Sequence, residues 1–188
     1  MRHALISGLT LCFVLMAGMP STVAQQQTTT SFAEIRAMAD RGMKKVDHDL
    51  FVEGIVISDA GNENLDLNRN RYYTTINQNE NNRRAYIESL DGQYGLRIVA
   101  KLPADNILKR YSSVQLSING LKLVKESNPE RYTLTGFTKE HVLNQNAGTA
   151  ADLPKKEKHI SELTDADIYT YVTGAAQCQA AQTMAGVL

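Results

Sequence analysis

The side chains most able to do chemistry lie in two segments, residues 84–89 and 96–101. Apolar and polar residues alternate in both, and successive side chains of a strand point to opposite faces. The apolar set expected to face a core is Ala85, Ile87, Leu96 and Ile98. The polar set expected to share the outer face is Arg84, Tyr86, Glu88, Arg97 and Lys101.

Tyr86 and the neighbouring arginines give this outer face the chemistry of a recognition surface. An aromatic ring can stack on a sugar ring or a base, and a guanidinium can pair with phosphate. Outward Arg, Tyr and Glu side chains also pair with one another on an ordinary solvated sheet. The sequence therefore leaves two interpretations open, a ligand-binding face and a plain polar exterior.

A second group of oxygen-bearing side chains lies in the polar stretch 59–70. Its candidate metal ligands are Asp59, Asn62, Asn64 and Asp66. Carboxylate and amide oxygens suit calcium, but the stretch lacks the glycine and the closing bidentate Glu of an EF-hand. The pattern favours a flexible polar loop, with a calcium site as the alternative.

No catalytic constellation is visible in the sequence. Nucleophilic catalysis needs a Ser or Cys beside a His and an orienting acid. His48, His141 and His159 lie in expected loops or element ends, and Gly-x-Ser-x-Gly is absent. Phosphate-binding glycine runs are absent too. We expect a protein that is not an enzyme and uses no cofactor.

The first 24 residues resemble a cleavable secretory signal peptide. Arg2 and His3 precede an apolar run over 4–17, Pro20 breaks it, and small residues stand at 22–24. The run is shorter than the roughly 20 residues of a membrane span. We expect an exported protein, in the periplasm, at the cell surface or secreted, with no transmembrane helix after signal removal.

Charge and cysteine content narrow the classes of partner. The 188 residues carry 20 basic and 20 acidic side chains, and loss of Arg2 with the signal would leave a formal charge of −1. Nucleic-acid binding depends on a surplus of Lys and Arg, so it is not expected. Cys12 lies inside the apolar run, not at the cleavage site, which argues against lipidation. Only Cys178 would remain, so no intramolecular disulfide is expected.

The elements that must position these residues are mostly strands. Ser31 and Glu34 form a capping box for a short helix that stops at Gly42. The apolar phase slips at Asn119–Gly120, which predicts a bulge in a curling strand. The expected strands are 50–58, interrupted by Gly54, then 84–89, 96–101, 114–123 and 132–135, with 71–77 as a further pairing segment. The pattern predicts a mainly β protein with a five-stranded OB-like barrel and a short N-terminal helix.

The chain divides into five parts by composition. We expect a signal peptide (1–24), a disordered spacer (25–30), an OB-like domain (31–143), a linker (144–159) and an incomplete second unit or anomalous tail (160–188). Residues 165–169 (DADIY) echo 47–51 (DHDLF), which lead into the first expected strand. The echo indicates that a second, truncated unit begins near Ile160.

Several segments, in this order, resemble a domain-of-unknown-function family (family 5689) of exported and surface proteins of gut Bacteroides-type bacteria. They are SFAEIRAM (31–38), DLFVEGIVISD (49–59), RAYIESLDGQYGLRI (84–98), VQLSINGLKL (114–123), NPERYTLTG (128–136) and HISELTDADIYTYVT (159–173). The resemblance implies an OB-like N-terminal domain and, in longer members, a further β domain. It implies no established activity. Many members carry a lipoprotein signal, which this chain lacks.

Two functions compete on these observations. The first is a noncatalytic exported binding module for a glycan or other polymer, acting through the outer face of 84–101. The second is a structural or assembly spacer of a cell-surface protein complex. Single-stranded nucleic-acid binding is a third alternative, disfavoured by the charge.

Overall fold

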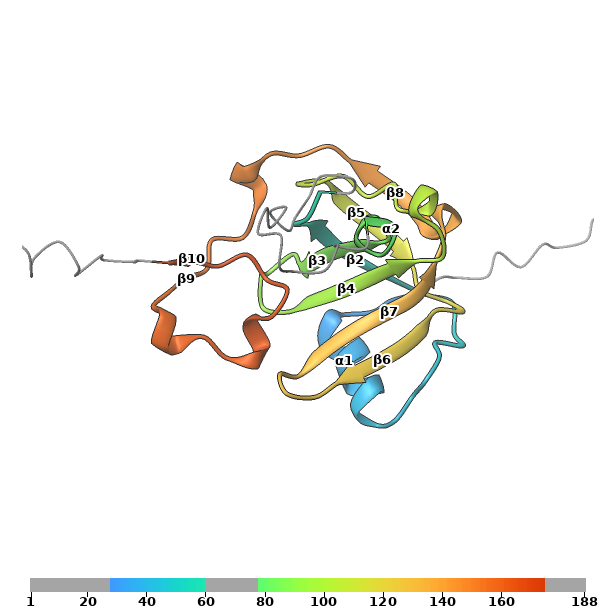
Figure 1. Ribbon diagram of the computed structural model, residues 1–188, viewed down its shortest axis with the longest axis horizontal. Helices are drawn as coiled ribbons and strands as arrows, with labels where there is room; N and C mark the ends of the chain where they lie inside the picture. Colours follow the sequence, from blue (N-terminus) through green and yellow to red (C-terminus); the bar gives the residue numbers. More distant parts are fainter. Residues whose placement is uncertain (1–27, 60–77, 175–188) are drawn as a thin grey trace, which may run out of the picture.

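The computed structural model of the protein describes residues 28–59 and 78–174. These residues form one mixed eight-stranded sheet, a two-stranded sheet and two helices (Figure 1). The large sheet contains β1 (Thr28–Thr29), β2 (Leu50–Val56), β3 (Arg84–Ser89), β4 (Gly95–Ala100), β5 (Ser113–Ser117), β6 (Lys122–Glu126), β7 (Arg131–Phe137) and β8 (Val142–Asn146). The remaining elements are α1 (Phe32–Asp40), α2 (Gln78–Asn82), β9 (Glu157–Lys158) and β10 (Thr173–Gly174). Short 3-10 turns occupy Pro103–Asp105, Lys139–His141, Ala150–Asp152, Ile160–Glu162 and Asp165–Asp167.

The large sheet follows the order β6–β7–β4–β3–β2–β5–β8, with β1 beside β2. The pairs β4–β7 and β1–β2 are parallel and the others are antiparallel. Over the described ranges β6 does not pair with β8, so the sheet is open. The mainly β class predicted from the sequence is confirmed, but over the described residues the expected five-stranded barrel is an open sheet of eight strands.

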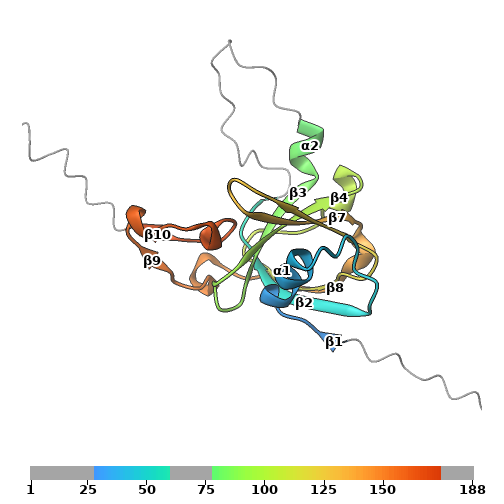
Figure 2. The ribbon, with the colours of Figure 1, turned by 90° about the horizontal axis from the view of Figure 1, so that it is seen from below.

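The apolar core lies between helix α1 and the sheet (Figure 2). All four apolar residues predicted to face inward belong to it, and none is more than 1% exposed. The helix contributes Phe32, Ile35 and Ala39. The strands contribute, among others, Val52, Ala85, Ile87, Leu96, Ile98, Leu116, Leu123 and Leu134.

Helix α1 begins as the capping box predicts. The N–H of Glu34 donates to Ser31 Oγ at 3.1 Å, and the N–H of Ser31 donates to Glu34 Oε2 at 2.7 Å. This exchange satisfies two N–H groups that the first helical turn leaves open. Gly42, with φ of 85°, lies just beyond the end of the helix and turns the chain.

Gly54 in β2 marks a close approach of other groups to the strand. Gly54 interrupts the apolar run in the sequence, but the pairing of β2 with β5 stays in register across it. A Cβ at Gly54 would lie 2.5 Å from the main-chain oxygen of Glu88 and 2.8 Å from Cζ of Phe32. The missing side chain therefore lets the Phe32 ring of α1 pack directly on β2 and β3.

The bulge predicted at Asn119–Gly120 is instead a turn, which divides the expected strand 114–123 into β5 and β6. Gly120 has φ of 80°, and the N–H of Leu121 donates to the carbonyl of Ile118 at 3.2 Å. Before this turn β5 pairs with β2, and after it β6 pairs with β7. One stretch of chain thus serves both halves of the sheet.

The expected spacer 25–30 is partly wrong. Residues 28–29 form β1, and the N–H of Thr30 donates to the carbonyl of Phe51 at 2.8 Å. Strand β3 pairs only with residues 54–56 of β2. The earlier half of β2 therefore has a free edge on that side, which β1 occupies.

Two further segments differ from expectation. The stretch 144–159, predicted as a linker, begins inside β8, which pairs with β5. The Asn-rich stretch at 78–82, expected to connect strands, forms α2. The predicted strand 71–77, the signal peptide 1–24 and the tail from residue 175 lie outside the described residues.

We expect Gly54→Ala to lower the free energy of unfolding by about 1–3 kcal/mol, because the new methyl group overpacks the contact between Phe32 and β3. Chemical denaturation measures the change. Ser117→Ala on the neighbouring strand is the control. A Gly54→Ala protein as stable as the control would contradict the close approach.

Candidate functional site

The predicted outer face lies on the antiparallel pair β3 and β4. Tyr86 and Arg97 are direct cross-strand partners, and Glu88 lies opposite Gly95. The structure therefore brings three of the five predicted residues together at one end of the two strands.

The other two predicted residues lie at the opposite end of these strands. Arg84 begins β3, and its Nη2 is 3.9 Å from Oε2 of Glu80 in α2. Lys101 follows β4 and is exposed. Neither belongs to the cluster around Tyr86.

The surface of Tyr86, Glu88 and Arg97 is covered by a later part of the chain. We call residues 154–174 the strap; in both ribbon views it lies beside the end of the β3–β4 hairpin (Figures 1 and 2). Within the strap, β9 and β10 pair in parallel, and the N–H of Thr173 donates to the carbonyl of Lys156 at 2.9 Å.

Asp167 stabilises the strap internally. Its carboxylate lies 2.6 Å from Nζ of Lys156 and 2.8 Å from Nζ of Lys158, and it accepts the N–H of Thr164 at 2.8 Å. Burial by itself would raise the pKa of Asp167, but these partners hold that pKa well below its usual range. The strap is therefore an ordered unit centred on one buried carboxylate.

Tyr169 is the principal contact of the strap with the sheet. Its ring stacks on the ring of Tyr86, with centroids 4.8 Å apart and planes inclined by 28°. The guanidinium carbon of Arg97 lies 5.9 Å from the Tyr169 centroid. Tyr169 also adopts a φ of 64°, which turns the chain at this residue, and burial raises its pKa. An aromatic ring thus occupies the position above Tyr86 where a stacked ligand was expected.

Gly95 allows the main chain of Tyr169 to lie close against β4. A Cβ at Gly95 would lie 2.0 Å from the main-chain oxygen of Tyr169 and 2.7 Å from its Cβ. Any side chain at this position would therefore collide with the strap. The sequence shows Gly95 only as part of a turn, and its contact partner lies 74 positions further along.

Glu88 is the polar contact between the strap and the sheet. The N–H of Tyr171 donates to Glu88 Oε2 at 2.7 Å, and the Glu88 side chain is fully buried. Its Oε1 has no hydrogen-bond partner among the described residues. Burial raises the pKa of Glu88, outweighing the N–H of Tyr171 and the charge of Lys156, which both lower it.

Contacts on two turns complete the docking. A Cβ at Gly92, in the β3–β4 turn, would lie 2.7 Å from Cβ of Pro154. In the β6–β7 turn, the N–H of Glu130 donates to Oδ2 of Asp165 at 3.0 Å. The strap therefore touches the body at both of its flanks as well as at Tyr169.

The strap covers part of the predicted recognition surface, and ligand binding there stays a prediction. Glu88 points outward from the core as expected, but it is 0% exposed because the strap lies over it. Tyr86 and Arg97 are only partly exposed, and Arg97 Nη2 donates to Oε2 of Glu126 at 3.0 Å. In this conformation the strap contacts the face through Tyr169 and Tyr171.

The calcium prediction falls mostly outside the structure. Asp59 is described, whereas Asn62, Asn64 and Asp66 are not. Over residues 28–59 and 78–174, no three His, Cys, Asp or Glu side chains group closely enough to hold a metal ion. The calcium site stays a prediction.

No family model matches the chain, and neither the curated proteins nor the solved structures contain a significant match. None of the helices in the described ranges has the length and apolar character to cross a membrane.

The Glu88 carboxyl group predicts a pH dependence. Because its pKa is raised above the reference of 4.5, the folded protein holds this proton more tightly than the unfolded chain does. Its stabilising contribution is therefore full below the unfolded pKa and is lost as pH rises through the folded pKa. Glu88→Gln cannot ionise and removes this component.

Chemical denaturation from about pH 4 to about pH 8 measures it. The stability of the unsubstituted protein, relative to Glu88→Gln, should fall as pH rises. Since both proteins share every other titrating group, their difference isolates Glu88. A difference that rises with pH, or parallel profiles, would show that Glu88 is not buried beneath the strap.

Proposed function

We propose that this chain is a noncatalytic interaction module whose β3–β4 surface binds the strap and fixes the course of the polypeptide beyond the sheet. The proposal rests on the packing of Tyr169 against Gly95 and the stacking of its ring on Tyr86. Ring stacking, main-chain packing and a hydrogen bond to a buried carboxylate converge on two strap residues one position apart, Tyr169 and Tyr171. Such convergence favours the spacer or assembly function over an open binding face.

We infer from the strand order that the sheet is OB-like, and this inference favours the assignment. Strands β2, β3 and β4 form an antiparallel meander, and β7 runs parallel to β4. The consecutive strands β5 and β6 pair with β2 and β7, and a single bridge links Lys45, ahead of β2, to Lys122 of β6. OB-like barrels bind ligands across their second and third strands. By this correspondence those strands are β3 and β4, the surface that the strap covers.

An exported protein with a further unit is the context we infer for this module. The secretory-type N-terminus and the resemblance to family 5689 both favour it. Asp47–Phe51 leads into β2, and the echoing residues 165–169 form the part of the strap that docks. The module would then act as a spacer that holds the start of the following unit against its own sheet.

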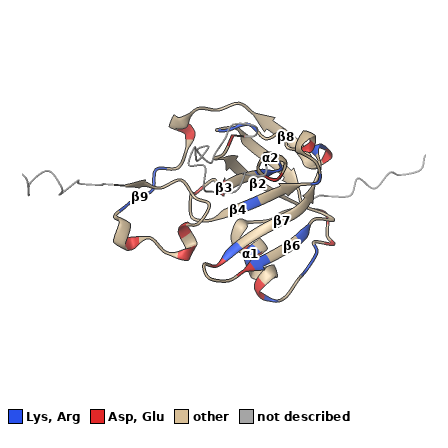
Figure 3. Ribbon diagram, in the orientation of Figure 1, with Lys and Arg blue, Asp and Glu red and all other residues tan. Residues whose placement is uncertain are grey.

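Ligand binding on this same face competes with the strap. A glycan or a base could stack on Tyr86 only by displacing Tyr169. Nucleic acid is further disfavoured because basic and acidic residues are interspersed (Figure 3). Glu126 lies 3.0 Å from Arg97 and 3.4 Å from Arg131. Paired arginines contribute little to the counterion release on which such binding depends.

Electron-spin distance measurements test the proposed function. Spin labels at Ile160→Cys on the strap and Lys122→Cys on β6 are introduced after both native cysteines, Cys12 and Cys178, are changed to Ser. Both labelled positions are exposed. We expect a narrow distance distribution in this protein and a broad one after Tyr169→Ala, because the strap loses its stacking contact.

Tyr171→Ala is the matched control. It removes an aromatic side chain from the same strap but keeps the main-chain N–H that Glu88 accepts. The control should therefore keep the narrow distribution. An equally broad distribution before and after Tyr169→Ala would contradict the proposal that the β3–β4 surface fixes the strap.

A further inference from the structure

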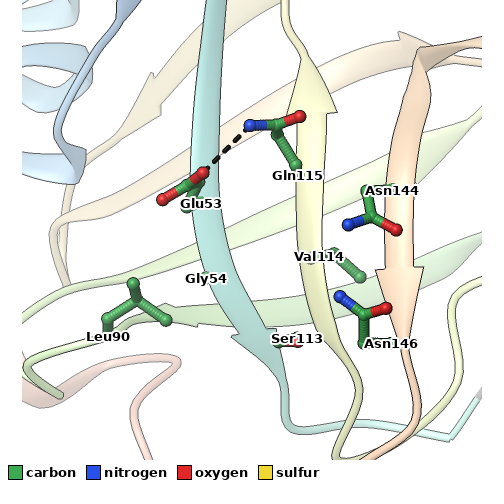
Figure 4. A pocket seen from close by; sticks show the side chains of 8 residues that line it. All are labelled: Glu53, Gly54, Leu90, Ser113, Val114, Gln115, Asn144 and Asn146. Carbon is green, nitrogen blue, oxygen red and sulfur yellow. Dashed lines mark hydrogen bonds between the residues drawn. The ribbon is translucent and has the colours of Figure 1, made fainter.

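A shallow hollow of about 200 Å³ lies on the outer face of β2, β5 and β8 (Figure 4). We call it the amide hollow. It is lined by Glu53, Gly54, Leu90, Ser113, Val114, Gln115, Asn144 and Asn146.

Strand register gathers the polar side chains of the amide hollow. Glu53 pairs with Gln115, and Gln115 pairs with Asn144, so these three form a row across three strands. Ser113 and Asn146 form the next row, two residues along each strand. Because alternate residues share a face of a sheet, both rows project to the same side.

The amides leave unused hydrogen-bonding capacity. Nε2 of Gln115 donates to Oε1 of Glu53 at 2.9 Å (Figure 4), which orients both side chains. Within residues 28–59 and 78–174, the structure gives no hydrogen-bond partner for the side-chain amides of Asn144 and Asn146. Each amide offers two N–H donors and one carbonyl acceptor.

One wall of the amide hollow is apolar. Leu90, in the turn after β3, is 56% exposed. Gly54 lies between Leu90 and the polar rows, and its backbone lines the hollow. The hollow therefore combines an exposed apolar patch with a group of neutral donors and acceptors.

The lining also determines the charge of a fitting ligand. Glu53 is the one charged side chain among the eight residues that line the hollow. An anionic ligand would meet a carboxylate with no Lys or Arg to offset it, which disfavours phosphate and acidic groups. A hydroxyl group both donates and accepts, and so matches amides and a carboxylate alike.

We propose that the amide hollow binds a neutral sugar residue. Its ring hydroxyls would bond to Asn144, Asn146 and Glu53, and its C–H face would lie against Leu90. The hollow is smaller than the about 300–1,000 Å³ of pockets that enclose drug-sized ligands, so it holds one sugar ring of a glycan. The site uses none of Tyr86, Glu88 and Arg97, so its test reads out side chains other than those beneath the strap.

Nuclear magnetic resonance titration of the full chain tests the site. The probes are the methyl glycosides of glucose, galactose, mannose and N-acetylglucosamine. At least one should shift the side-chain NH₂ resonances of Asn144 and Asn146 saturably, with a Kd in the millimolar range expected of a small open site. The double variant Asn144→Ala/Asn146→Ala should bind at least tenfold more weakly.

Two further variants keep the test specific. Leu90→Ser alters only the apolar wall and should also weaken binding. Gln93→Ala removes an exposed amide outside the hollow and should bind like the unsubstituted protein. Absence of saturable shifts with all four glycosides would overturn the proposal. Equal binding by the double variant would overturn it as well, since the sugar would then lie elsewhere.

Discussion

Glu88 of β3 adjoins Gly54 of β2 through its main chain and Tyr171 of the strap through its side chain. The packing of helix α1 on the sheet and the position of the strap both depend on these two contacts. The main-chain oxygen of Glu88 would lie 2.5 Å from a Cβ at Gly54, while its side chain accepts the N–H of Tyr171 at 2.7 Å. The lack of a side chain at Gly54 leaves room for the Phe32 ring beside β3. The hydrogen bond from Tyr171 determines where the strap lies. Strand β3 thus contacts the core on one side and the strap on the other.

The polar half of this contact has an energetic cost, which the neighbouring contacts must offset. A buried carboxyl group with one unpaired oxygen is unfavourable when ionised, and burial raises the pKa of Glu88 accordingly. Stacking of Tyr169 on Tyr86 and packing on Gly95 act in the opposite direction. Stacking on Tyr86 and packing on Gly95 therefore stabilise the docked strap, and the hydrogen bond to Glu88 orients it. This balance suits a permanent internal contact better than an exchangeable ligand site.

Local structure could be predicted from the sequence, whereas contacts between residues far apart in the chain could not. The Ser31 cap and the change of apolar phase at Gly120 depend on neighbouring residues alone, so the sequence shows both. Strand β8 was not predictable, because its polar stretch acquires strand character only by pairing with β5. The alternation of residues in β3 predicts that Tyr86 and Glu88 share one face of the sheet. It does not predict that the strap lies over that face. The close contact of Gly95 with Tyr169 spans 74 positions and has no local signal.

The central claim is that Tyr169 of the strap is energetically coupled to Tyr86 of the sheet. A double-mutant cycle measures this coupling directly, using the free energies of unfolding of Tyr86→Ala, Tyr169→Ala, the double variant and the unsubstituted chain. Stacked aromatic pairs contribute about 0.5–1.5 kcal/mol beyond their burial, and we predict a favourable coupling in that range. Strictly additive effects of the two substitutions would contradict the account.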